Sequence, residues 1–490
     1  MSFILNICKI FNNSSYGDRG GKMDWNNLLS RKRLGIKSED TEKQDNEDKH
    51  PSFQRDFNRI IFSSAFRRLQ DKTQVFPLAT TDFVRTRLTH SLESSSVGRS
   101  LGSIAGNSLP EKYKLPNDIQ SSDLGTIVAT ACLAHDIGNP PLGHAGEEAI
   151  RSFFINNYKR KEKLNENELA DLEKFEGNAQ GFRILTRLQY PENKGGLNLT
   201  YATLAAFLKY PTSSLDTLST EDKDVSKEFS YKKHGFFNFD KEFFDEVVGE
   251  VGLVKRKNSE YARHPLAFLV EAADDICYRI VDFEDSYRFK LIDFDNVYSS
   301  LHAIAGCNDE FYSFKKLSKN LEDIKDKDRK IEYLRAKSIH VLIHKAVDVF
   351  IENIDKIMTG EFNSDLVSDI KNENIEKALN AIEKESIKYA YHSLGVLDVE
   401  IVGFKVIPEL LRIFLEASND ACEKGGIEKS SSVNKRILLR FPQLLNEQDV
   451  KKGISEYERI LKVTDFISGM SDSFAVSVYK KLSGMSLPGM

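Results

Sequence analysis

Residues 124–141 read LGTIVATACLAHDIGNPP, and this stretch decides the expected fold. Its first eleven residues are apolar or small at helical spacing, which predicts a buried helix. The following Ile-Gly-Asn-Pro-Pro ends that helix sharply. His135 and Asp136 therefore stand at the end of a core helix. Because a buried carboxylate is costly unless a positive group pairs with it, the pair predicts a bound cation such as a divalent metal ion.

Two further helical stretches supply partners for this pair. His90 lies in RTRLTHSLE, and residues 266–285 read LAFLVEAADDICYRIVDFED. In the second stretch Asp274, Tyr278 and Asp282 fall at i, i+4 and i+8, on one side of an otherwise apolar helix. Solvation on a helix surface is the alternative for Asp274, and the apolar sequence on both sides argues against it.

Together the three helices offer two imidazoles and two carboxylates, with room left for water: His90, His135, Asp136 and Asp274. Such a nitrogen and oxygen set suits Mg, Mn, Fe, Co, Ni or Zn, so the residues leave the ion open. His340 and His344 are also four apart, but no acidic residue follows them as in a zinc peptidase. We interpret them as helix-surface histidines.

The whole chain has the composition of a soluble globular protein. Of its 490 residues 40% are hydrophobic and 29% charged, and the net charge is −5. This predicts a sizeable core and no general attraction to nucleic acid or anionic lipid. Five cysteines are scattered without CxxC pairing, as in a reducing compartment. No run approaches the roughly 18 apolar residues of a membrane span, so we expect a cytoplasmic protein with no membrane partner.

Helical spacing dominates the chain, so we expect a mainly α fold. The predicted helices occupy residues 124–136, 143–158, 264–285, 320–360, 365–391 and 403–423, and residues 157–176 alternate charge as an exposed helix would. Residues 38–50 and 211–228 have loop composition. We expect one large helical core over residues 23–300, followed by a helical C-terminal extension over residues 301–490.

The first 22 residues do not fit a signal peptide, because they lack a basic region and a cleavage site. The run Arg19-Gly20-Gly21-Lys22 precedes Met23 and can be encoded by purine-rich codons like those of a bacterial ribosome-binding site. We therefore hypothesise that translation starts at Met23 and that residues 1–22 are non-native. The intact mass of the natively expressed protein tests this.

Seven longer motifs follow one another from Met23 onward. They are MDWNNLLSRKRLG, RDFNRIIFSSAFRRLQDKTQVFPL, RTRLTHSLE, AHDIGNPPLGHAGE, FEGNAQGFRIL, HPLAFLVEAADDICYRIVDFED and YERILKVTDFISGMSD. In this order they resemble the bacterial deoxyguanosine triphosphate triphosphohydrolases, members of the HD superfamily. The resemblance implies an HD-type helical core that hydrolyses dGTP to deoxyguanosine and inorganic triphosphate, with residues 301–490 completing the nucleotide site and making oligomer contacts. It also implies a homo-hexamer, and leaves open activation by a second dNTP and binding of single-stranded DNA.

The resemblance assigns roles position by position. It makes His90, His135, Asp136 and Asp274 the metal ligands, with magnesium or manganese favoured. It places Tyr278 against the deoxyribose, where it screens against a ribose 2′-hydroxyl. Further substrate contacts are implied at Gln70, Arg87, Asn178, Lys209, Lys232, Lys233, Asp282, Tyr391 and Glu400. Of these, Arg87 and the lysines suit phosphate, Gln70 and Asn178 the sugar and phosphate, and Tyr391 and Glu400 guanine.

The implied reaction is attack of metal-bound water on the α-phosphorus. A divalent ion lowers the pKa of its water toward about 7, and the cationic side chains neutralise the triphosphate. The departing 5′-oxygen needs a proton, for which His144 is our candidate. Glu147, three residues on, would orient His144 and favour its protonated form. A simple helix-start contact between the two is the alternative.

Two rival interpretations remain open. One is an HD phosphohydrolase of broader dNTP or other nucleotide specificity. The other is a nucleotide-sensing or single-stranded-DNA-binding protein, which Arg67, Arg68 and Phe76 fit weakly because they also fit the wall of an active site. The presence of all four predicted metal ligands favours an enzyme.

Overall fold

The structure is a computed structural model that describes residues 21–37, 39, 51–76, 85–217, 233–256, 261–307 and 314–486. Across these ranges the chain is helical, and strand pairing is confined to three isolated bridges. The predicted mainly α class is confirmed. Most of the expected extension 1–22, nearly all of the predicted loop 38–50 and the second half of 211–228 lie outside the described residues. None of the helices within these ranges is long and apolar enough to cross a membrane.

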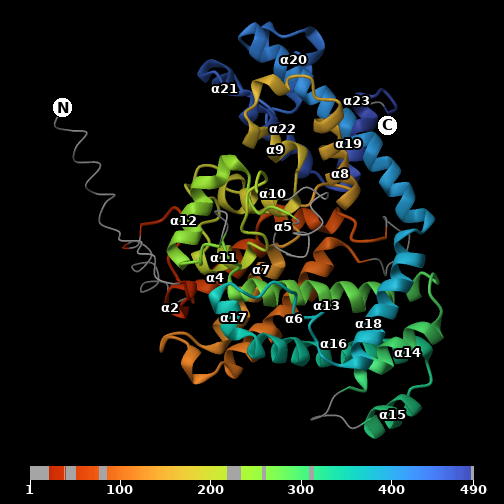
Figure 1. Cartoon of the computed structure of the whole chain (residues 1–490). Helices are drawn as coiled ribbons and strands as arrows, with labels where there is room; N and C mark the ends of the chain where they lie inside the picture. Colours follow the sequence, from red (N-terminus) through yellow and green to blue (C-terminus); the bar gives the residue numbers. More distant parts are fainter. Residues whose placement is uncertain are drawn as a thin grey trace, which may run out of the picture.

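The first core holds most of the chain before residue 390 (Figure 1). Its helices are α2 (Trp25–Leu28), α4 (Ser52–Ile61), α5 (Ser64–Arg68), α6 (Arg87–Ser108), α7 (Ser121–Ala134), α11 (Tyr201–Phe207), α12 (Lys241–Val251), α13 (Pro265–Arg288), α14 (Phe294–Ala305), α15 (Phe314–Asp323), α16 (Lys327–Glu352), α17 (Ile354–Thr359) and α18 (Glu373–Glu385). Helix α7, almost wholly buried, lies at its centre and packs on α4, α6, α11 and α13.

The second core combines an early segment with the end of the chain. Its helices are α8 (Gly143–Asn156), α9 (Glu166–Glu173), α10 (Gly177–Arg183), α19 (Leu394–Lys424), α20 (Ser432–Arg440), α21 (Glu447–Lys452), α22 (Glu456–Ser468) and α23 (Asp472–Leu482). Figure 1 shows α19 running along one side of the molecule from α18 to the group that contains α20–α23. Residues 149–179 thus share a core with residues 406–479.

Glycines bring α6 and α7 into close contact. A Cβ atom at Gly102 would lie 2.7 Å from the Leu124 carbonyl oxygen, and one at Gly98 would lie 2.7 Å from Cys132 Sγ. A larger residue at either position would therefore push the helices apart. This approach places His90, near the start of α6, beside His135 at the end of α7.

The predicted helices 124–136, 143–158 and 264–285 are confirmed to within a few residues as α7, α8 and α13. The exposed helix predicted over 157–176 was wrong in extent. Its first part holds a short 3₁₀ turn at Lys161–Lys163, and α9 starts only after Asn165, whose side chain caps it. The window 320–360 is likewise interrupted, because Asp326 caps a new helix, α16.

Candidate active site

A cleft of about 490 Å³ opens where the two cores meet. Its walls come from the segment Thr73–Val75, the starts of α6 and α8, the end of α7, and parts of α10, α13 and α19. Ten of the predicted site residues line it: His90, His135, Asp136, Asp274, His144, Arg87, Asn178, Lys209, Lys233 and Tyr278. Tyr391 and Glu400 line it as well. Residues spread over some 300 positions of sequence are thereby brought together.

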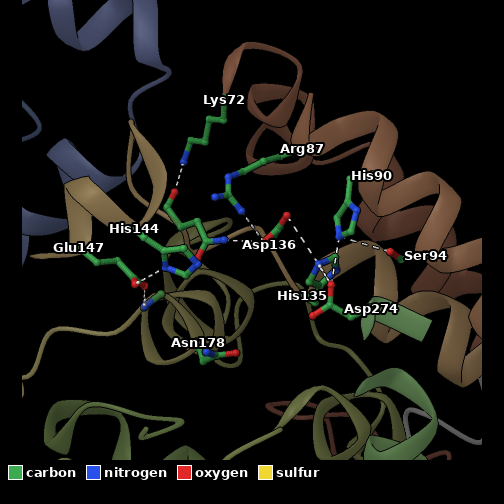
Figure 2. A network of polar contacts seen from close by, with 12 residues as sticks. Lys72, Arg87, His90, Ser94, His135, Asp136, His144, Glu147, Asn178 and Asp274 are labelled. Atoms are coloured by element: carbon green, nitrogen blue, oxygen red, sulfur yellow. Dashed lines mark hydrogen bonds and ion pairs between the residues drawn. The ribbon is translucent and has the colours of Figure 1, made fainter. Parts of the chain in front are cut away.

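Three predicted metal ligands converge at the base of this cleft (Figure 2). Asp274 Oδ1 lies 3.1 Å from His90 Nε2 and 3.5 Å from His135 Nε2. The other nitrogen of His135, Nδ1, lies 2.6 Å from the Cys132 carbonyl oxygen and therefore carries the proton. This contact leaves the lone pair of His135 Nε2 directed at the cluster. Metal-binding histidines commonly donate their other ring N–H to a carbonyl oxygen in this way.

The fourth predicted ligand, Asp136, presents one oxygen to the same place. Its Oδ1 accepts hydrogen bonds from Arg87 Nη1, at 2.7 Å, and from Asn139 Nδ2. Its Oδ2 is buried, 3.6 Å from His135 Nε2, and has no hydrogen-bond donor among the described residues. Buried carboxylate oxygens normally have partners. Two imidazole nitrogens and two carboxylate oxygens, one of them unpartnered, fit a divalent cation.

Electrostatics at the cluster are dominated by the carboxylates. Burial opposes protonation of His90, but the hydrogen bond and charge of Asp274 outweigh it and raise the pKa of His90 to about 9. Burial disfavours the charged form of Asp274, yet His135, His90 and Lys209 hold its pKa well below the usual range. The site thus stabilises positive charge. Among the described residues, His90, His135 and Asp274 form the one cluster of this kind that could hold a metal ion.

His144 lies at the opposite wall, at the beginning of α8. Its side chain is 85% exposed, and its Nδ1 is 3.3 Å from Oε2 of Glu147, which is 3% exposed. The other carboxylate oxygen of Glu147 accepts the Gly177 N–H at 2.7 Å. Burial opposes ionisation of Glu147, but His144 and Lys233 lower its pKa to about 2. An ionised, fixed carboxylate therefore orients an imidazole that reaches into the cleft.

The predicted phosphate contacts form a cationic rim. Lys209 Nζ lies 3.3 Å from Glu271 Oε1 and 4.0 Å from Asp274 Oδ2. Lys233 Nζ donates to Glu176 Oε1 at 3.1 Å, and the Asn178 amide donates to the same oxygen at 2.8 Å. Lys232 lies outside the described residues.

Two tyrosines form the aromatic side of the cleft. The rings of Tyr278 and Tyr391 are nearly parallel, with centroids 5.8 Å apart and an angle of 7° between their planes. Tyr278 is 43% exposed, so its ring is accessible to a flat or apolar part of a ligand. Asp282 is buried one turn beyond Tyr278, behind the cleft wall, and burial raises its pKa to about 8.

Two sequence-based assignments, Gln70 and Asp282, are not brought to the cleft lining, and the role of Asp282 as a substrate contact stays a prediction. Gln70 is exposed on the 3₁₀ turn Leu69–Asp71, away from the cleft lining, so its role stays a prediction. Gln74, four residues later, lines the cleft instead. His340 and His344 pair with each other on α16, with ring centroids 4.7 Å apart, outside the cleft.

Two acidic residues that line the cleft, Glu271 and Asp275, were not predicted from the sequence as site residues. Glu271 is buried in the wall, bound by Arg263 Nη1 at 2.5 Å as well as by Lys209. Its position one turn before Asp274 on the apolar helix was the signal that could have revealed it. Asp275 lines the cleft too. Burial and the charges of Glu271 and Asp274 hold its pKa above the usual range.

Comparison with known proteins shows relatives over most of the chain. No family model matches it. A "Deoxyguanosinetriphosphate triphosphohydrolase-like protein" of Synechocystis is 42% identical over 471 residues, which cover 95% of this chain and 100% of that protein. A protein of the same name from Listeria monocytogenes is 36% identical, with the same coverage. A "Deoxyguanosinetriphosphate triphosphohydrolase" of Yersinia pseudotuberculosis is 30% identical, covering 88% of this chain and 93% of that protein.

Proposed function

The chain belongs to the deoxyguanosinetriphosphate triphosphohydrolase family, and on that premise we propose that it is a metal-dependent dNTP triphosphohydrolase. Its preferred reaction is the hydrolysis of dGTP to deoxyguanosine and inorganic triphosphate. The observation that carries this proposal is the buried cluster with the unpartnered Asp136 Oδ2, at the base of a cleft rimmed by lysines and closed by a pair of tyrosines.

In this proposal His90, His135, Asp136 and Asp274 hold the metal ion, with magnesium or manganese favoured. A divalent ion in such a site polarises a phosphate oxygen and makes water a nucleophile near neutral pH. Arg87 keeps Asp136 in place through Oδ1 and points its guanidinium into the cleft. It therefore binds phosphate without moving away from the ligand that it orients.

The triphosphate lies along the cationic rim. Lys209 and Lys233 now pair with Glu271 and Glu176, and the phosphate oxygens compete for the same ammonium groups. Charge-assisted hydrogen bonds of this kind are among the stronger ones in proteins. The buried glutamates prevent the lysines from folding away, so both cations stay at the cleft surface.

Proton transfer to the leaving group is assigned to His144. Its Nδ1 faces Glu147, so the proton for the 5′-oxygen comes from Nε2. The bond from water oxygen to the α-phosphorus forms, the bond to the 5′-oxygen breaks, and the nucleoside leaves as an alcohol. Loss of a general acid typically costs about 10²–10⁴ in rate.

The nucleoside occupies the aromatic side of the cleft. Tyr278 packs on the deoxyribose, and Tyr391 and Glu400 contact the base. From the family resemblance alone we also propose a cytoplasmic homo-hexamer, with a second dNTP as activator and single-stranded DNA as a further ligand to be tested.

Product analysis tests the function. Purified protein is incubated with dGTP, each other dNTP and GTP, with Mg²⁺ or Mn²⁺ or with a chelator, and phosphorus NMR identifies the products. We expect inorganic triphosphate and nucleoside, no reaction with chelator, and a preference for dGTP. Pyrophosphate with a nucleoside monophosphate, or no turnover, would contradict the proposal; equal rates for all dNTPs would favour the broader enzyme.

Two variants assign the roles within this assay. His144→Ala should retain metal and nucleotide binding but lose most turnover. His340→Ala replaces an exposed histidine outside the cleft and should behave like the wild type. Wild-type turnover in His144→Ala would remove the general acid from the mechanism.

A further inference from the structure

The motif YERILKVTDFISGMSD, residues 457–472, lies outside the cleft lining, yet it holds several segments that form the cleft. Asp465 accepts from Arg183 Nε at 2.8 Å and from the Gln180 amide at 2.9 Å, both on α10. The Ser468 carbonyl oxygen accepts from Lys72 Nζ at 2.9 Å. Lys72 also donates to the carbonyl oxygen of Asn139, in the loop after the predicted metal ligands.

The last residue of the motif, Asp472, connects two cleft walls. Its side chain is 1% exposed at the start of α23. Oδ1 accepts the Leu142 N–H at 2.8 Å, and Oδ2 accepts the Thr73 N–H at 2.9 Å. Leu142 and Thr73 both line the cleft. In the chain, Thr73 precedes His90 and Leu142 follows His135. One buried carboxylate therefore fixes the spacing of two backbone segments.

The Leu142 end of this bridge is conformationally strained. Leu142 has φ +65°, and Gly143 follows with φ +60°. The left-handed region is unfavourable for a residue with a Cβ, and such residues persist where their surroundings hold them. The turn leads directly into His144, and α8 has no side-chain cap of its own at this end. Asp472 accepts the N–H of the strained residue itself.

We propose that Asp472 is a positioning residue, which holds the Leu142–Gly143 turn and thereby sets His144 against the Thr73 wall. Asp472 is itself outside the cleft lining, so it acts through the two lining segments that it holds, one of which leads into His144. Helix α23, more than 300 residues after His144 in the sequence, thereby contributes to the geometry of the active site. The proposal rests on the proposed function for its kinetic consequence, but its structural consequence can be measured without substrate.

The substitution Asp472→Asn tests this with little change of shape. An amide can accept only one of the two N–H groups with its oxygen, and its own N–H₂ then faces the other. We expect amide hydrogen exchange at Leu142, at Thr73 or at both to accelerate at least about tenfold in the substrate-free protein. Mn²⁺ affinity should stay within about twofold, because the ligands themselves are untouched. Unchanged exchange at both amides overturns the proposal whatever the activity.

Kinetics then show whether Asp472 acts through His144. For dGTP hydrolysis we expect kcat of Asp472→Asn to fall on the order of 10- to 100-fold, within the range of a displaced general acid. In the His144→Ala background the same substitution should cost less than about threefold, because residues that act as a unit are not additive. A full additional loss in that background would show a general structural effect and contradict the assignment.

The control is Asp56→Asn, a more severe change at another buried carboxylate. Asp56 accepts the Thr200 N–H at 2.9 Å and also pairs with Arg33 Nη1 at 2.5 Å, but it lies outside the cleft lining. It should accelerate exchange near Thr200 and leave Leu142 exchange and kcat of the folded protein within about twofold. Should Asp472→Asn fail to fold, Asp472→Ser keeps an uncharged acceptor and undergoes the same exchange measurement. If the wild type hydrolyses no nucleotide, the proposed function fails, while the exchange measurement still decides the role of Asp472.

Discussion

We expect acidification to lower the free energy of unfolding through protonation of one buried histidine, His264. The side chain caps α13: its Nδ1 accepts the Leu266 N–H at 3.1 Å, and its Nε2 lies 3.0 Å from the Leu28 carbonyl oxygen. Both contacts are satisfied only when Nδ1 is bare and Nε2 carries the proton, so the folded state holds the neutral form. Burial accordingly lowers the pKa of His264 to about 4.

The sign of the effect follows from proton binding. An unfolded histidine has a pKa of about 6.5, so between pH 6.5 and 4 the unfolded chain binds more protons at this position than the folded chain. The free energy of unfolding therefore falls as the pH decreases through this window, and is fully restored above it. With pKa values of about 4 and 6.5, the loss between pH 7 and pH 5 is about 2 kcal/mol.

Urea unfolding at pH 7 and pH 5 measures this loss. The variant His264→Asn keeps an oxygen that can accept the Leu266 N–H but cannot take up a proton, so its stability should change about 2 kcal/mol less than that of the wild type over this interval. His392→Asn, at an exposed histidine, controls for the removal of an imidazole. Equal pH dependence in the wild type and His264→Asn would refute the assignment of a neutral cap.

Three further predictions concern the packing and the cleft. Gly102→Ala should destabilise the protein by about 1–3 kcal/mol, because the new Cβ meets the Leu124 carbonyl oxygen; a gain of about 1 kcal/mol in the free energy of unfolding by urea, as at an exposed helical glycine, would contradict the close approach. Asp136→Asn should weaken Mn²⁺ binding, measured by calorimetry, by at least about tenfold, and unchanged affinity would remove it from the ligand set. Tyr278→Ala should reduce the preference for dGTP over GTP by about tenfold or more in kcat/KM, because the ring that would screen against a 2′-hydroxyl is gone; an unchanged ratio would place sugar discrimination elsewhere.

The parts of this protein that could be predicted are those with local, periodic causes. The apolar run before His135 and the spacing of Asp274, Tyr278 and Asp282 on one helix face are visible in sequence, and the structure forms helices there. The contact between His144 and Glu147 can be predicted in the same way, because Glu147 lies one turn further on the same helix.

Other features depend on contacts between distant segments. Charge alternation over 157–176 has helical period, but Asn165 caps a helix in the middle of it, so the local capping group overrides the pattern. Gln70 and Gln74 are indistinguishable by residue type, and only the path of the turn decides which of them faces the cleft. The bridge from Asp472 to Leu142 joins residues 330 positions apart, and no local period reports such a contact.

The composition of the second core sets an order of events during synthesis. Residues 149–179 pack against residues 406–479, so the apolar face of α8 lacks its C-terminal packing partners until nearly the whole chain has been synthesised. The helices that carry His90, His135 and Asp274 belong to the first core and can associate earlier. We therefore expect a nascent chain to assemble the half with the proposed metal ligands first and the half with His144, the proposed proton donor, last. On the proposed function, the partly folded chain would bind a metal ion before it could hydrolyse a nucleotide.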